Sequence, residues 1–207
     1  MFFRPNKKRF LFVTHNQNKL KEIGKMFPSQ HELISLKEIS YHDEIPETGK
    51  TLEENALQKA TTVYELVGYD CFADDTGLEV EALGGEPGVY SARYAGDNAS
   101  DQDNVSKLLK AMEGEENRRA CFRTVIALLI NKQEHFFEGR VDGYIAKAPS
   151  GEQGFGYDPV FIPEGWDKTF AEMGLAEKNR ISHRGKALND LVRYINMMEV
   201  KSLRFWF

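Results

Sequence analysis

The feature that most constrains this chain is a series of short apolar runs, each of which stops at a cluster of polar residues or glycines. Residues 10–13 form such a run, and apolar residues at helical spacing follow over 20–27. This succession predicts a strand, a polar loop and a helix. Helices alternate with strands early in the chain, and apolar runs cluster later at 120–130, 133–141 and 144–148. The pattern predicts an α/β fold in which helices pack on a mixed sheet.

Boundary signals define the other elements. Thr51-x-x-Glu54 fits a capping box and Gly68 ends the apolar stripe that follows, so a helix is predicted over 52–67. Residues 71–73 predict a buried strand that enters a polar turn at 74–77. A glycine-rich irregular stretch then continues to residue 96, and the other predicted elements are helices over 101–112 and 185–200 and a short strand near 160–162.

Composition excludes several classes of protein. The 207 residues are 41% hydrophobic and 29% charged, which rules out fibrous and wholly disordered chains. The chain has 27 Lys and Arg against 32 Asp and Glu, a net charge of −5, which argues against a surface that coats DNA or RNA. We expect a single domain of two lobes over 1–207, with peripheral tails at 1–8 and 201–207. A local basic pocket is compatible with this charge.

The two cysteines and the N-terminus indicate a location. Cys71 and Cys121 have apolar neighbours and lie outside any C-x-x-C pattern, which favours two reduced core thiols over a disulfide or a zinc site. The N-terminus has no apolar run of signal-peptide length, and no window approaches a membrane span. We therefore expect a cytoplasmic protein without membrane contact.

Three acidic residues are candidates for a metal site. Asp74 and Asp75 follow an apolar strand, and Glu47 precedes the capped helix. Mg²⁺ takes one or two carboxylates and fills its other positions with water and phosphate oxygens, so Glu47 with Asp74 or Asp75 would suffice. Two adjacent acids are also common turn formers. Asn55 and Lys59 share one face of the helix, which is either part of the site or a solvated surface.

Cations gather near the starts of two predicted helices. Thr14, Asn16 and Lys19 lie at the first strand-to-helix junction, where free N–H groups favour an anion, although a polar loop with a surface lysine explains them equally well. Lys178 and the run 182–185 precede the last helix, where the helix dipole disfavours cations. A bound anion would account for this placement, whereas a structural role is the alternative for His183.

The turn 154–159 supplies two aromatic residues. Phe155 and Tyr157 are two residues apart between glycines, so their rings either stack on a flat base or pack in the core. Carboxylates, cations and a base platform together suit a nucleoside triphosphate better than a polymer. The chain has no P-loop, kinase or nucleophile-elbow motif, so hydrolysis by a metal-positioned water is the natural reaction.

These motifs resemble those of the inosine triphosphate pyrophosphatase family, also called dITP/XTP pyrophosphatases. The resemblance covers residues 10–192, nearly the whole chain. Six motifs occur in the family's order and approximate spacing. They are Thr14-x-Asn16-x-x-Lys19, Glu47-Thr48-Gly49 with Glu54-Asn55-Ala56-x-x-Lys59-Ala60, Asp74-Asp75-Thr76-Gly77-Leu78, Pro87 to Tyr94, Gly154 to Pro159, and Ser182-His183-Arg184-Gly185.

The resemblance implies a Mg²⁺-dependent enzyme that hydrolyses dITP, ITP and XTP to the monophosphate and pyrophosphate and so removes deaminated purines from the nucleotide pool. The implied fold is a long curved mixed sheet whose flanking helices form two lobes around a cleft, in a homodimer. Asp75 matches the proton acceptor and a metal ligand, and Glu47 the second metal ligand. The implied substrate contacts are Thr14, His15, Asn16, Gln17, Asn18, Lys19, Thr76, Phe155, Gly156, Tyr157, Asp158, Lys178, His183 and Arg184, supported by Asp74, Asn55, Lys59 and Arg93.

The chain departs from the family pattern at three positions. Thr76 stands in place of serine, His15 in place of a small residue, and Ser150 in place of an arginine, whose loss removes a cation. These departures bear on substrate affinity and preference rather than on reaction type. A non-catalytic nucleotide-binding module, a pyrophosphatase of dUTP or dTTP and, more remotely, a nucleic-acid-binding protein are the rival functions. We further expect Lys19, Lys59, Lys178 and Arg184 to converge on one cleft opposite Glu47 and Asp75.

Overall fold

A mixed seven-stranded sheet forms the centre of the computed structural model, which describes residues 7–204, and the backbone alone for 199–204. The sheet has the order β2-β1-β3-β5-β6-β7, with β4 paired to β3. The β1–β2 and β1–β3 pairs are parallel and the others antiparallel. The strands are β1 Arg9–Phe12, β2 Glu32–Ser35, β3 Cys71–Val80, β4 Pro87–Gly88, β5 Arg119–Ile130, β6 Gln133–Ile145 and β7 Phe161–Pro163.

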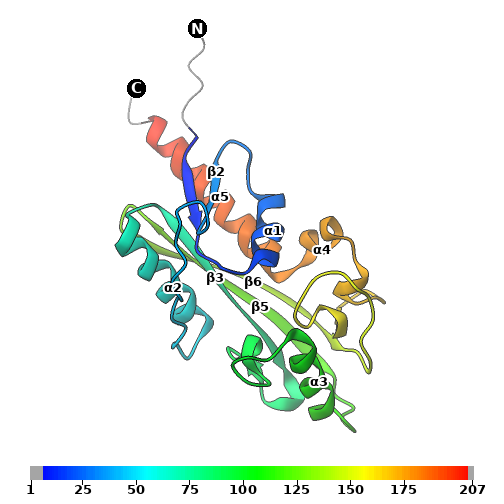
Figure 1. The fold of residues 1–207 in the computed structure, drawn as a ribbon. Helices are drawn as coiled ribbons and strands as arrows, with labels where there is room; N and C mark the ends of the chain where they lie inside the picture. Colours follow the sequence, from blue (N-terminus) through cyan, green and yellow to red (C-terminus); the bar gives the residue numbers. More distant parts are fainter. Residues whose placement is uncertain (1–6, 205–207) are drawn as a thin grey trace.

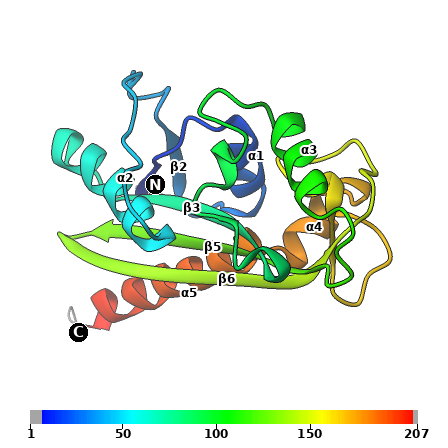
Figure 2. The same ribbon diagram turned by 90° about the horizontal axis from the view of Figure 1, so that it is seen from below.

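Five helices surround this sheet within the described residues. Helices α1 and α2 connect the parallel strands, and Figure 2 shows α2 and α5 on opposite faces of the sheet. The predicted α/β fold with a curved mixed sheet is confirmed. The helices are α1 Gln17–Met26, α2 Leu52–Val67, α3 Asp101–Ala111, α4 Leu175–Ile181 and α5 His183–Arg204. Short 3₁₀ turns lie at Glu81–Leu83, Ser91–Arg93, Asp158–Val160 and Phe170–Glu172.

Strand alternation separates the core into clusters on the two faces of the sheet. Phe10, Phe12 and Phe72 pack with α1 and α5, whereas Leu11 and Ala73 pack with α2. A third cluster joins the far halves of β3, β5 and β6 to α3 and β7. The long strands therefore pass through both halves of the molecule (Figure 1). No helix of the described part is long and apolar enough to cross a membrane.

Two predicted turns are instead parts of strands. Asp74 and Asp75 do not begin a turn, because β3 continues to Val80 and pairs with β5 along its whole length. The two strands predicted at 133–141 and 144–148 are one strand, β6, in which Gly143 pairs with both Ala120 and Pro163. Acidic pairs and Asp-Gly steps usually form turns, but the ladders on both sides override that preference here.

The helix predictions need smaller corrections. Thr51 caps α2 as predicted, but the Glu54 carboxylate accepts from the Lys50 N–H, so the capping box is incomplete. Helix α5 begins at His183 and extends to Arg204, beyond the predicted bounds of 185–200, while β2 and α4 were not predicted. Of the tail predicted at 1–8 only Lys7 and Lys8 are described, and Phe205, Trp206 and Phe207 lie outside the described residues. Cys71 and Cys121 are buried and free, as predicted.

Candidate active site

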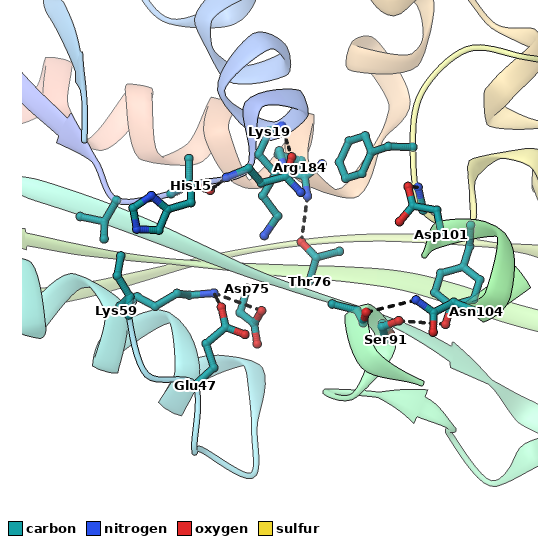
Figure 3. A pocket seen from close by; sticks show the side chains of 18 of the residues that line it. His15, Lys19, Glu47, Lys59, Asp75, Thr76, Ser91, Asp101, Asn104 and Arg184 are labelled. Atoms are coloured by element: carbon teal, nitrogen blue, oxygen red, sulfur yellow. Dashed lines mark hydrogen bonds and ion pairs between the residues drawn. The ribbon is translucent and has the colours of Figure 1, made fainter. Parts of the chain in front are cut away.

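A cleft of about 320 Å³ opens over the middle of β3, between the loop that carries Glu47 and the aromatic turn (Figure 3). Its volume lies within the range of small-molecule sites. Segments from all parts of the sequence contribute to it. The lining residues are Val13, Thr14, His15, Asn16, Lys19, Glu44, Ile45, Glu47, Lys59, Asp75, Thr76, Ser91, Ala92, Asp101, Asn104, Phe122, Phe155, Gly156, Tyr157 and Arg184.

Two carboxylates share one ammonium group on the α2 side of the cleft. The Lys59 Nζ lies 2.7 Å from the Glu47 carboxylate and 3.3 Å from that of Asp75. The Asn55 amide donates to the second Asp75 oxygen at 3.1 Å. Asn55 and Lys59 are buried, so this face of α2 is not a solvated surface. Helix α2 thus holds the Asp75 carboxylate at both of its oxygens.

Charge balance keeps Lys59 and Glu47 ionised. Burial alone would lower the pKa of Lys59, but the Asp75 and Glu47 charges outweigh it and raise that pKa above its usual value. Burial likewise opposes ionisation of Glu47, yet Lys59 lowers the pKa of this carboxyl. Arg93 reaches the same loop, with its guanidinium 3.8 Å from the Glu47 carboxylate and donating to the Glu47 carbonyl.

The polar loop after β1 forms the start of α1. The Asn16 side chain accepts from the N–H groups of Asn18 and Lys19, so it caps the helix. His15 Nε2 lies 2.9 Å from the Asp43 carbonyl and ties this loop to the one that leads to Glu47. Gln17 and Asn18 do not line the cleft.

A buried ion-pair network lies on the other face of β3. The Arg184 guanidinium contacts Asp74 at 3.1 Å and Glu22 at 2.5 Å, and it donates to the Thr76 hydroxyl at 3.1 Å. Lys19 contacts the same Asp74 oxygen at 3.1 Å. Burial alone would raise the pKa of Asp74, but Lys19 and Arg184 hold it well below its usual range. Asp74 and Asp75 therefore serve opposite faces of one strand, as alternation requires.

The aromatic turn is compact rather than extended. Tyr157 is buried and its hydroxyl donates to the Ser91 carbonyl at 2.9 Å, and both Tyr157 and Phe155 line the cleft. Asp158 accepts from the Phe155 N–H and pairs with Lys178 at 2.5 Å. Burial raises the pKa of Asp158 despite that lysine.

Lys178 lies behind the cleft rather than in it. Its Nζ contacts Glu22 at 2.6 Å and lies 5.1 Å from the Phe155 ring centroid. It lines a neighbouring cavity of about 340 Å³, which shares Phe155 with the cleft. Lys19, Lys59 and Arg184 converge on the cleft, but Lys178 does not line it, because Glu22 and Asp158 bind it inside the protein.

His183 is buried against the sheet. Its ring stacks on Phe122 with the centroids 4.5 Å apart, and its Nδ1 has no hydrogen-bond partner among the described residues. Burial and the positive charges of Arg184 and Lys178 keep the pKa of His183 well below its usual value. The imidazole is therefore neutral at physiological pH, and it does not line the cleft.

Comparison with known proteins decides the family. The family model described as the Ham1 family matches residues 10–194. The chain belongs to the Ham1 family. A dITP/XTP pyrophosphatase of Flavobacterium psychrophilum is 52% identical over 90% of this chain and 98% of its own length. One of Porphyromonas gingivalis is 52% identical over 88% of this chain and 95% of its own.

Solved structures of Ham1 proteins are also similar. That of Staphylococcus aureus has a TM-score of 0.83 and 40% identity, and covers 92% of this chain and 100% of its own. That of Coxiella burnetii has a TM-score of 0.84 and 39% identity, and covers 92% of this chain and 99% of its own. The resemblance inferred from the motifs is confirmed, as is the prediction that the chain is a hydrolase.

Several residues of the Ham1 site were not predicted. Glu22 joins Lys178 to Arg184, and Asp101 accepts the Gly156 N–H at 2.7 Å and so holds the aromatic turn. Asn104 is buried and donates to the Ala92 carbonyl at 3.1 Å. The only sequence signal near Asp101 and Asn104 is the predicted start of a helix. The sequence around Glu22 is typical of a surface residue of α1. Their partners are distant in the sequence, so no local pattern identifies them.

Proposed function

We propose that this Ham1 protein is a Mg²⁺-dependent pyrophosphatase of nonstandard purine nucleoside triphosphates. It hydrolyses ITP, dITP and XTP to the monophosphate and pyrophosphate and so removes deaminated purines from the nucleotide pool. The observation that carries this proposal is the pair of carboxylates, Glu47 and Asp75, on one wall of a cleft that also presents Lys19, Arg184 and Phe155. The names of the curated relatives support the same substrate class.

The two carboxylates fit a magnesium ion. Both contact the same lysine nitrogen, so their oxygens are neighbours, and both are hard oxygen donors of the type that Mg²⁺ selects. The described residues include no group of three or more acidic, histidine or cysteine side chains that could hold a metal, so water and phosphate oxygens would complete the coordination of the ion. We propose Glu47 and Asp75 as its protein ligands. When bound, the ion neutralises phosphate charge and lowers the pKa of bound water.

Asp75 takes the proton of the attacking water in this proposal. Asn55 and Lys59 hold its two oxygens and orient the carboxylate. The protonated Lys59 also limits repulsion between the triphosphate and the acidic wall. Fixed groups of this kind act without reorganising during the reaction.

Lys19 and Arg184 bind the phosphates from the opposite wall. Burial lowers the pKa of Lys19, although Asp74 acts in the opposite direction. A bound triphosphate adds negative charge beside the ammonium and favours its protonated form. The N–H groups at the start of α1 add further donors for an anion.

Base selection is assigned to the Phe155 region. Lys178 and Arg184 both lie over the Phe155 ring, at 5.1 and 5.4 Å from its centroid. Arg184, which lines the cleft, is a hydrogen-bond donor that suits a 6-oxo purine and leaves a 6-amino base facing another donor, whereas Lys178 lies behind the cleft. Mismatches of this kind discriminate strongly, which accounts for rejection of ATP.

The deciding experiment is pyrophosphate release from a panel of triphosphates, with Mg²⁺ and with EDTA. We expect ITP, dITP and XTP to be hydrolysed at least about 100-fold more efficiently than ATP, and EDTA to stop turnover. Preference for dUTP or dTTP would reassign the base site. Binding of ITP without turnover in Mg²⁺ would identify a nucleotide-binding module instead. A homodimer is a further part of the proposal, and light scattering coupled to gel filtration measures it.

A further inference from the structure

Gly139 of β6 lies directly beneath the first turn of α5. In the sheet it pairs with Thr124 of β5, which in turn pairs with Thr76 of β3. The two threonine hydroxyls lie 2.6 Å apart, and Thr124 is fully buried. A row of short side chains thus crosses three strands at the point where α5 begins.

The helix approaches Gly139 more closely than a side chain at that position would permit. A Cβ atom at Gly139 would lie 1.9 Å from the His183 carbonyl oxygen and 2.7 Å from the Ala187 backbone nitrogen. Real Cβ contacts are essentially never shorter than 3.0 Å. Both obstacles are backbone atoms, so a side-chain rotation cannot remove the overlap. Any larger residue at 139 must move the helix or the strand by about 1 Å.

The neighbouring rows on the same face of the sheet are bulky. Leu78 pairs with Phe122 on one side, and Ile126 pairs with Phe137 on the other. The short row is therefore a local depression between rows of bulkier side chains. The first turn of α5 occupies it, while His183 stacks on Phe122.

That first turn carries Arg184, whose position depends on contacts with little tolerance. Its guanidinium reaches Glu22 at 2.5 Å, Asp74 at 3.1 Å and Thr76 at 3.1 Å, from a side chain that is 4% exposed. A displacement of about 1 Å would break these contacts, because hydrogen bonds weaken steeply beyond their normal length. Misplacement on this scale far from the reacting atoms can cost an enzyme about 100-fold in rate.

We propose that Gly139 is a positioning residue of the active site, which sets the depth at which α5 seats on the sheet and so places Arg184 in the cleft. The inference rests on the proposed function, because it treats Arg184 as a phosphate and base contact. It assigns a role in the reaction to a residue that touches no part of the cleft.

The test is Gly139→Ala, with a control substitution at a second glycine where an added Cβ would also overlap backbone atoms. Gly143 lies on the same strand, and a Cβ there would lie 2.3 Å from the Ile162 carbonyl oxygen, away from α5. We expect both variants to lower the melting temperature, but only Gly139→Ala to lower kcat/KM for ITP, by about 100-fold. An equal loss in Gly143→Ala, or unchanged kcat/KM in Gly139→Ala, would overturn the proposal.

A double-mutant cycle identifies the residue through which Gly139 acts. In an Arg184→Lys background, Gly139→Ala should lower kcat/KM by no more than about two-fold, since residues that act as one unit are not additive. An undiminished loss in that background would contradict the proposal. Should Gly139→Ala not fold, Thr124→Ile compared with Thr124→Val adds one methyl group to the same row, and the same cycle applies.

A second readout does not depend on activity. The Arg184 Nε–H resonance, assigned by its loss in Arg184→Lys, should be visible in the wild type and in Gly143→Ala and should shift or broaden in Gly139→Ala. An unchanged resonance would overturn the role of Gly139. Absence of pyrophosphate release by the wild type would instead overturn the proposed function, whatever the resonance shows.

Discussion

Asp74 and Asp75 are adjacent in sequence but have different surroundings. Asp74 is 1% exposed and bound by Lys19 and Arg184, whereas Asp75 lines the cleft and is oriented by Asn55 and Lys59. The first carboxylate holds cations in place. The second is the one with access to a substrate.

Asp75→Asn should abolish turnover and leave the fold intact. The amide has nearly the same shape but cannot accept a proton, and loss of a general base costs about 10²–10⁴-fold in rate. Pyrophosphate release from ITP measures turnover, and the circular dichroism spectrum measures whether the fold is intact. Asp190→Asn, an exposed carboxylate on α5, is the control. Near-normal turnover in Asp75→Asn would exclude this assignment.

The sequence predicted those site residues whose residue type and spacing along the chain both indicate a role in the site. Asn55 and Lys59 share a helix face and do meet Asp75, and Phe155 does line the cleft. Glu22 was not predicted, because nothing near it in the sequence distinguishes it from a surface glutamate. It is recognised only when α4 and α5 bring Lys178 and Arg184 to it.

The N-cap of α2 matters to both stability and the site. The Thr51 hydroxyl accepts from the Glu54 N–H, and the helix that it starts carries Asn55 and Lys59. Thr51→Ala should lower the free energy of unfolding by about 1 kcal/mol and reduce kcat/KM. Thr61→Ala makes the same change within the same helix and should leave both nearly unchanged. Chemical denaturation measures the difference, and equal effects of the two substitutions would contradict the prediction.

The first turn of α5 should make stability depend on pH. His183 is neutral in the folded protein because burial, Arg184 and Lys178 lower its pKa, while in the unfolded chain its pKa is about 6.5. Below that pH the unfolded state binds a proton that the folded state excludes. The free energy of unfolding should therefore fall by about 1.4 kcal/mol per pH unit as pH drops below 6.5.

Urea denaturation between pH 7.5 and 5.5 measures this dependence. His183→Gln should remove most of the slope. A slope that persists in His183→Gln would assign the effect to other groups.

Elements were predicted well where their ends carry their own signals. Thr51 and Gly68 gave the bounds of α2 correctly. The continuity of β3 through Asp74 and Asp75 was not predictable in this way, because the carboxylates are neutralised by Lys19, Arg184 and Lys59, which come from other elements. The Asp142-Gly143 step was misread for a similar reason, since β7 packs against that glycine.

The whole molecule should unfold as one unit, because β3, β5 and β6 join two groups of apolar clusters, here called lobes: one beside α3 and β7, the other beside α1, α2 and α5. In a Trp206→Phe background the fluorescence of Trp166, which follows β7, reports on one lobe, while far-ultraviolet circular dichroism reports on all helices. The two urea transitions should coincide. Separate midpoints would show that the lobes are independent.

Asp74 and Asp75 point to opposite faces of β3. The protein is therefore sensitive to insertions in this strand. One residue added to β3 upstream of this pair would turn every later side chain to the other face. The cation-holding acid and the substrate-facing acid would then exchange sides, with no atom of either having changed. For each carboxylate to keep its face, the number of residues in β3 upstream of the pair can change only in steps of two.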